Sequence, residues 1–128
     1  MPERLRFQSY RQWAEAITPG LRAAIAGERE VPPQDPFSEA WLGYTLFYYS
    51  RLLSVEEVIE AADTISHAIP NPNEIAWAFL RLKERGWLVV EGDSYGLTAE
   101  ARHTIEAIVP GNKVEVERLS QWISTHSP

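Results

Sequence analysis

The chain has 128 residues and no cysteine, which excludes disulfides, thiolate metal sites and a cysteine nucleophile. Apolar residues make up 45% and charged residues 23%, a balance that excludes a disordered chain and suits one folded domain. No stretch approaches the ~20 apolar residues of a membrane helix. We therefore expect a cytoplasmic protein with no membrane partner. The net charge of −6 weighs against a broad basic surface for nucleic acid.

Residues 1–30 form a predicted N-terminal helical extension. Apolar residues recur there at three- and four-residue steps, the stripe of an amphipathic helix: Tyr10, Trp13, Ala14, Ile17, Leu21, Ala24 and Ile25. Thr18-Pro19-Gly20 interrupts the stripe, and proline fits best at the first position of a helix. This predicts either two short helices or one kinked helix. The proline-rich segment 27–36 then predicts an extended linker.

The densest structural signals lie in residues 37–109, the predicted main domain. Phe37 to Leu52 reads as a helix that is apolar nearly all round, so we expect it to be central or covered by a partner chain. Ser54 and Glu57 have capping-box spacing, which predicts a helix from Val55 to about His67.

A third helix is predicted from Pro72 to Arg85, because Asn71 can cap it and Gly86 can end it. Residues 87–90 and 94–97 read as two strands joined by the turn 91–93.

The chain is then predicted to end in two helices. Thr98 caps one that runs to Ile108. The other, about Lys113 to Thr125 within a C-terminal unit of residues 112–126, presents one apolar side.

The segment 82–102, LKERGWLVVEGDSYGLTAEAR, resembles the corresponding part of the winged helix-turn-helix regulators of the MarR type. Leucine, glycine, an apolar strand, a wing and a Leu-Thr cap follow one another there in the order of that family. The resemblance covers about residues 37–108. It implies a mainly α fold with a small two-stranded β wing, and a DNA-binding transcriptional regulator that dimerises through helices outside the winged domain.

In a winged helix-turn-helix the second helix of the pair enters the major groove, here the predicted helix 72–85. Asparagine pairs well with adenine and arginine with guanine. The expected DNA-contacting residues of that helix and of the hairpin are Asn73, Trp77, Arg81, Lys83, Arg85, Ser94 and Tyr95.

Two observations favour a different function. Trp77 and Leu80 fall on the outward face of the same helix, where an apolar pair needs a cover: a terminal helix of the chain, a partner protein, or a sugar or thymine methyl. The helix 55–67 has four acids and no base, and the hairpin turn places Glu91 and Asp93 where phosphates would lie. The alternative is a winged-helix protein-interaction module that does not bind DNA.

The apolar stripes of the terminal helices and the helix 37–52 predict a homodimer. The expected interface residues are Trp13, Ile17, Trp41, Phe47, Tyr48, Leu119, Trp122 and Ile123. The aromatic residues of the helix 37–52 could also line a pocket for a small apolar effector, although core packing explains them more simply.

Nothing in the sequence predicts an enzyme. Asp63 and His67 share a helix face but lack a third metal ligand, and a helix-end histidine is the simpler reading. No phosphate-binding glycine loop and no nucleophile with a base can be identified. We therefore predict no catalytic residue, no metal and no cofactor.

Overall fold

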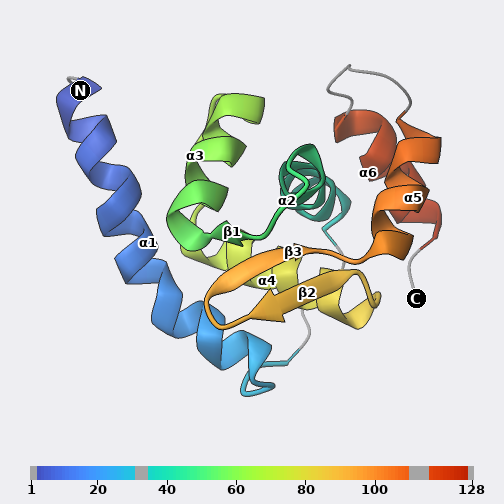
Figure 1. Ribbon diagram of the computed structural model, residues 1–128, viewed down its shortest axis with the longest axis horizontal. Helices are drawn as coiled ribbons and strands as arrows, with labels where there is room; N and C mark the ends of the chain where they lie inside the picture. Colours follow the sequence, from blue (N-terminus) through green and yellow to red (C-terminus); the bar gives the residue numbers. More distant parts are fainter. Residues whose placement is uncertain (1–2, 31–34, 110–115, 127–128) are drawn as a thin grey trace.

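The computed structural model describes residues 3–30, 35–109 and 116–126, and for residues 3–9 the backbone alone. This part of the chain is mainly helical with a small antiparallel three-stranded sheet, an arrangement compatible with a winged helix (Figure 1). The elements are α1 (Glu3–Ile25), α2 (Pro36–Tyr48), β1 (Leu53–Ser54), α3 (Val55–Ser66), α4 (Pro72–Glu84), β2 (Leu88–Glu91), β3 (Ser94–Leu97), α5 (Ala99–Ile108) and α6 (Val116–Thr125). None of these helices is both long and apolar enough to cross a membrane.

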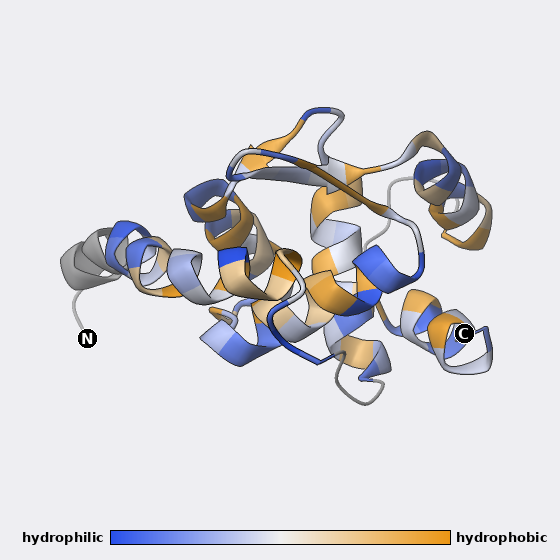
Figure 2. Cartoon of the chain, turned by 90° about the horizontal axis from the view of Figure 1, so that it is seen from below, coloured by the Kyte–Doolittle hydropathy of each residue, from blue (hydrophilic) through white to orange (hydrophobic). Residues whose placement is uncertain are grey.

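Helix α2 lies at the centre and packs against α3, α4 and α6 of the same chain. Apolar residues gather on the central helices, whereas polar and apolar residues alternate along α1 (Figure 2). The Trp41 indole donates a hydrogen bond of 3.0 Å to the Ala62 carbonyl, which ties α2 to α3. The prediction of a covered helix is confirmed, and the chain itself supplies the cover. The helix ends at Tyr48 rather than at Leu52, because the chain turns extended at Tyr49.

Local capping signals place the starts of α3 and α4 correctly. In each capping box the cap side chain accepts a hydrogen bond from the third helical N–H, and a glutamate accepts one from the cap N–H. For α3 the Ser54 hydroxyl accepts from Glu57 N–H at 3.2 Å, and the Glu57 carboxylate accepts from Ser54 N–H at 2.9 Å. For α4 the Asn71 side chain accepts from Glu74 N–H at 2.8 Å, and the Glu74 carboxylate accepts from Asn71 N–H at 2.9 Å. Gly86 has a φ of +84° just after α4, as predicted for a glycine stop.

The predicted two-stranded wing is corrected to a three-stranded sheet of order β1–β3–β2. Strand β1 has only two residues, and it pairs Leu53 with Tyr95 and Ser54 with Ser94. A strand this short shows no period-two pattern, so the sequence could not reveal it. Gly96 in β3 lies against Leu52, where an added Cβ would come within 2.6 Å of a leucine methyl. A larger residue at this position would therefore require the Leu52 side chain to shift.

The N-terminal segment is one helix rather than two, because α1 continues through Pro19. The Thr18 hydroxyl donates a hydrogen bond of 2.6 Å to the Ala14 carbonyl one turn earlier in the same helix. Helix α1 packs along α3 and α4 with a buried apolar stripe that continues on both sides of the proline: Ala14, Ile17, Leu21 and Ala24.

Two polar contacts add to this packing of α1. The Tyr10 hydroxyl donates to the Asp63 carboxylate at 2.6 Å, and the Trp13 indole donates to the Pro70 carbonyl at 2.7 Å.

Helix α6 packs on α2 with Leu119 and Ile123 fully buried. Its Trp122 ring stacks on Trp87, with ring centroids 5.7 Å apart. The predicted helix start at Lys113 lies outside the described residues, and the described helix begins at Val116. Both terminal helices therefore pack against the central part of their own chain.

Candidate interaction surface around α4 and α3

The two arginines at the end of α4 point into the protein. Glu39 of α2 is fully buried, with an Oε1 atom 3.2 Å from Arg85 Nη2 and an Oε2 atom 3.8 Å from Arg81 Nε. The side chains of Arg81 and Arg85 are only 12% and 6% exposed. Arg85 also donates to the His126 carbonyl at 2.9 Å and lies over the rings of Trp87 and Trp122. Both cations therefore connect the end of α4 to α2, and Arg85 also connects it to the residue after α6.

Of the apolar pair on α4 that is expected to need a cover, Leu80 is buried, whereas Trp77 is not fully covered. Ala76 and Leu80 are 2% and 4% exposed, and the Lys83 ammonium group donates to the Ile25 carbonyl at 2.6 Å. The N-terminal helix α1 packs against α4, so a terminal helix of the same chain supplies this cover. Asn73 stays exposed, and Trp77 is 43% exposed. These two residues define the open part of α4.

The hairpin residues expected at the DNA backbone lie in different surroundings. Ser94 is half-buried, and Tyr95 is 1% exposed with its ring 5.1 Å from that of Phe79. Burial raises the pKa of the Tyr95 hydroxyl above its ordinary value. The carboxylate of Asp93 in the turn accepts two hydrogen bonds from Arg22 of α1. The hairpin is therefore attached to α1 (Figure 1).

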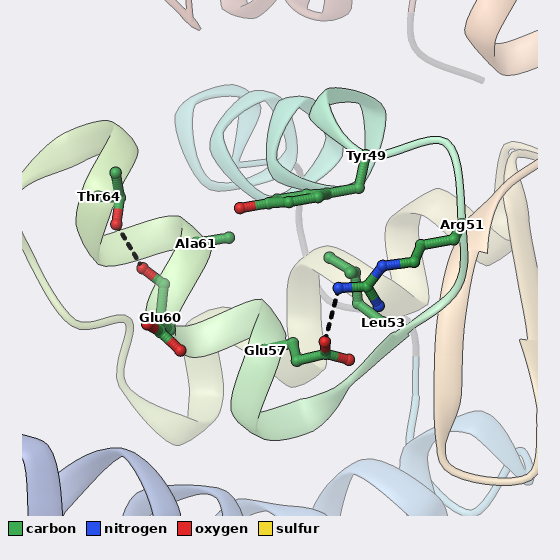
Figure 3. Close-up of a pocket in the computed structure, with 7 residues that line it drawn as sticks. All are labelled: Tyr49, Arg51, Leu53, Glu57, Glu60, Ala61 and Thr64. Atoms are coloured by element: carbon green, nitrogen blue, oxygen red, sulfur yellow. Dashed lines mark hydrogen bonds and ion pairs between the residues drawn. The ribbon is translucent and has the colours of Figure 1, made fainter.

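A partly open cavity of about 170 Å³ lies between the end of α2, β1 and α3 (Figure 3). Its walls are formed by Tyr49, Arg51, Leu53, Glu57, Glu60, Ala61 and Thr64. The Tyr49 ring covers one side, and its hydroxyl points towards α3 (Figure 3). The Glu57 carboxylate of α3 lies on the opposite side (Figure 3). Sequence reasoning missed this cavity, although the acidic helix without a base was a signal that could have found it.

One cation already occupies an edge of this cavity. Arg51 donates to Glu57 at 2.7 Å, and its guanidinium carbon lies 5.7 Å from the centroid of the Tyr49 ring. This hydrogen bond, with a second from the Ser54 backbone, lowers the pKa of Glu57 to about 2. Glu60 is exposed and forms no ion pair with a cation of the described segments. The cavity thus has one paired carboxylate and one open carboxylate.

The residues expected at a dimer interface are mostly used within one chain. Ile17, Trp41, Leu119 and Ile123 are at most 3% exposed in the single chain. Trp13, Phe47 and Trp122 are partly buried against the same core. Tyr48 alone among the eight expected residues is largely exposed, at 61%.

The remaining sequence candidates have structural partners. His67 ends α3 in the left-handed conformation, at φ +54°, and its N–H donates to the Asp63 carbonyl. The described segments hold no group of three or more His, Asp or Glu side chains placed to bind a metal. Trp41 and Tyr44 pack in the core rather than lining an effector pocket.

Comparison with protein-family profiles, with curated proteins and with solved structures finds no significant match. The function must therefore be argued from the geometry of this chain.

Proposed function

We propose that this protein is a winged-helix protein-interaction module that does not use α4 to read DNA. The order α2, β1, α3, α4, β2, β3 and the sheet order β1–β3–β2 support the winged-helix assignment. The MarR-type resemblance of residues 82–102 agrees with it. Because one fold supports many functions, the choice between DNA and protein as the ligand depends on the surface of α4.

The observation that favours a protein partner is the pairing of Arg81 and Arg85 with the buried Glu39. A DNA-reading helix needs these cations free to reach base edges and phosphates. Turning both arginines outward would leave the Glu39 carboxylate buried without a cation partner, which costs several kcal/mol. Lys83, the remaining base of this helix, is held by the last turn of α1.

The surface around α4 also disfavours a phosphate backbone. Helix α3 has four acids and no base, and the hairpin turn contains Glu91 and Asp93. Arg22, the cation next to the turn, is paired with Asp93. Phosphate neutralisation supplies most non-specific affinity for DNA, so a surface with these charges should bind it weakly.

The open part of α4 suits a protein contact. Trp77 presents a large ring beside the polar Asn73, and tryptophan is enriched among the residues that dominate protein interfaces. The net charge of −6 and the acidic α3 favour a partner with a basic contact surface.

Titration of mixed-sequence duplex DNA at low ionic strength, followed by fluorescence anisotropy, tests the proposal. We expect no binding, and no change for Lys83→Ala. Lys83→Ala is the informative variant because Lys83 is not paired with a buried carboxylate. Its removal should therefore leave the core intact. Binding that weakens steeply with salt, and weakens again in Lys83→Ala, would instead establish the DNA-binding regulator.

A further inference from the structure

The cavity between α2, β1 and α3 has walls suited to a cation. One wall is the face of the Tyr49 ring, the Glu57 carboxylate lies across from it, and Glu60 of α3 also lines the cavity (Figure 3). Aromatic faces attract ammonium and guanidinium groups, and carboxylates accept their hydrogen bonds. We infer that this cavity binds the guanidinium group of an arginine side chain presented by a partner protein.

Arg51 shows the chemistry of this binding within the chain itself. Its guanidinium group lies between the Tyr49 ring and the Glu57 carboxylate (Figure 3), 5.7 Å from the ring centroid and 2.7 Å from the carboxylate oxygen. A second guanidinium in the cavity would meet the same ring and the Glu60 carboxylate.

The balance of charge favours a cation over an anion in this cavity. Arg51 neutralises Glu57, so Glu60 leaves the lining with a net negative charge. No basic residue lies on α3, and Glu56 adds to the negative potential on the same helix. A phosphate or carboxylate ligand would be repelled by these groups.

Tyr49, which forms the wall, is held through both its backbone and its ring. Arg102 of α5 donates to the Tyr49 carbonyl at 2.6 Å, and the Tyr48 ring packs edge-on against the Tyr49 ring at 5.3 Å. A wall fixed before binding lowers the entropy cost of capturing a flexible arginine. The cavity is thus preorganised by contacts outside its own lining.

This inference deepens the proposed function and rests on it, because the partner protein would supply the arginine. The probe is a short capped peptide, acetyl-Gly-Arg-Gly-amide, titrated into the full chain and followed by the amide NMR signals of Glu60, Ala61 and Thr64. The comparison peptide has glutamine in place of arginine. We expect weak binding of the arginine peptide, local shifts at these three amides, and no such shifts with the glutamine peptide.

Four variants test the role of the cavity. Glu60→Gln should weaken the peptide about fivefold, the upper range for an exposed ion pair. Glu56→Gln removes the same charge from the same helix outside the cavity, so it should weaken the peptide less than twofold. Tyr49→Phe should bind like the unmodified chain and Tyr49→Leu should lose binding, because only the first keeps an aromatic face.

Equal affinity in Glu60→Gln and the unmodified chain would overturn the inference, as would equal shifts from the glutamine peptide. If Tyr49→Leu does not fold, the comparison of Glu60→Gln with Glu56→Gln still decides. If the arginine peptide does not bind and DNA does not bind either, only the inference about the arginine cavity is rejected. Salt-dependent DNA binding rejects the proposed function, whatever the peptide does.

Discussion

Arg22 near the end of α1 donates two hydrogen bonds to the carboxylate of Asp93 in the β2–β3 turn. The bond from Nε to Oδ1 is 2.8 Å long, and the other runs from Nη2 to Oδ2. The two residues are 71 positions apart in the sequence. A fork-to-carboxylate contact fixes the orientation of both groups as well as joining them. The turn that would touch DNA in a winged-helix regulator is therefore attached to the N-terminal helix.

We expect Asp93→Asn to loosen the last turns of α1 from the hairpin without unfolding the chain, because the apolar stripe of α1 still packs on α3 and α4. Amide hydrogen exchange should rise near Ala24 and Ile25, while exchange in α2 stays slow. Glu28→Gln, which removes an exposed charge just after α1, is the matched control. Unchanged exchange in Asp93→Asn would show that the contact does not attach the helix.

The same contact should depend on pH. The hydrogen bonds from Arg22 lower the pKa of Asp93 below its ordinary value. A lowered carboxylate pKa stabilises the attachment above about pH 4, where the unattached carboxylate is also ionised. The stabilisation is lost as pH falls through the lowered pKa. Acidification of the unmodified chain should therefore reproduce the exchange pattern of Asp93→Asn.

The Arg51–Glu57 pair gives a second pH prediction, with a value attached. The pKa of Glu57 is lowered from 4.5 to about 2, first by the hydrogen bond from Arg51 and then by the Ser54 backbone. Its contribution to stability should be full above 4.5 and should disappear as pH falls through about 2. Arg51→Met should raise the pKa of Glu57 towards its ordinary value in a carboxyl NMR titration. Arg11→Met, on α1 and paired there with Glu15, should leave that pKa unchanged.

Arg102 should be a major stabilising residue although it lies on the short helix α5. Its guanidinium donates to the carbonyls of Leu46, Phe47 and Tyr49, which the end of α2 leaves without helical partners. Hydrogen bonds with a charged group contribute about 1.5–3 kcal/mol. Arg102→Met should therefore lower the free energy of unfolding in urea by about 2–3 kcal/mol.

Two comparisons test this assignment of Arg102. His103→Ala, exposed on the same helix, should change the free energy of unfolding by less than about 0.5 kcal/mol. Arg102→Lys should recover only part of the loss, because one ammonium group cannot reach three carbonyls in the geometry of the guanidinium fork. If Arg102→Lys recovered the full free energy of unfolding, the stabilisation would come from the positive charge rather than from the shape of the guanidinium group.

Removal of the buried carboxylate should destabilise the protein strongly. Glu39→Ala leaves Arg81 and Arg85 buried without it, which costs about 3–5 kcal/mol in comparable sites. Replacing all three residues by leucine or methionine should recover most of that loss in urea unfolding, because an apolar cluster needs no charge partner. If Glu39→Ala were as stable as the unmodified chain, the arginines would not depend on it.

We expect the chain to sediment as a monomer, because most residues predicted for a dimer interface are used in its own core. Ile17, Leu119 and Ile123 are at most 2% exposed and offer no surface to a second copy. Sedimentation velocity over a range of concentrations measures the state directly. A dimer that Tyr48→Asp dissociates would show instead that the exposed end of α2 is an interface.

Local sequence signals predicted much of the fold. Ser54, Asn71 and Thr98 each accept the hydrogen bond expected of a helix cap, and Gly86 ends α4 as expected. These contacts lie within a few residues of one another, so the sequence contains all the information they need.

At Pro19 the sequence left two outcomes open, two short helices or one helix through the proline, and packing decided between them. A proline inside a helix costs about 3 kcal/mol. Ile17 and Leu21 are both buried, on either side of it, and burying side chains of this size contributes about 1.5–3 kcal/mol each. The helix therefore continues through the interruption, and local preference alone could not choose between the two outcomes.

The sequence by itself determined where the helices begin and which of their faces are apolar, because caps and periodicity are local properties. Only the tertiary structure decided what the polar groups bind. Arg81 and Arg85 have the sequence pattern of DNA contacts, yet they lie against Glu39, which is 46 positions away from Arg85. The same is true of the cavity, which joins Tyr49 after α2 to Glu60 in α3. The partner of a side chain depends on how the helices pack, and a one-dimensional pattern does not contain that information.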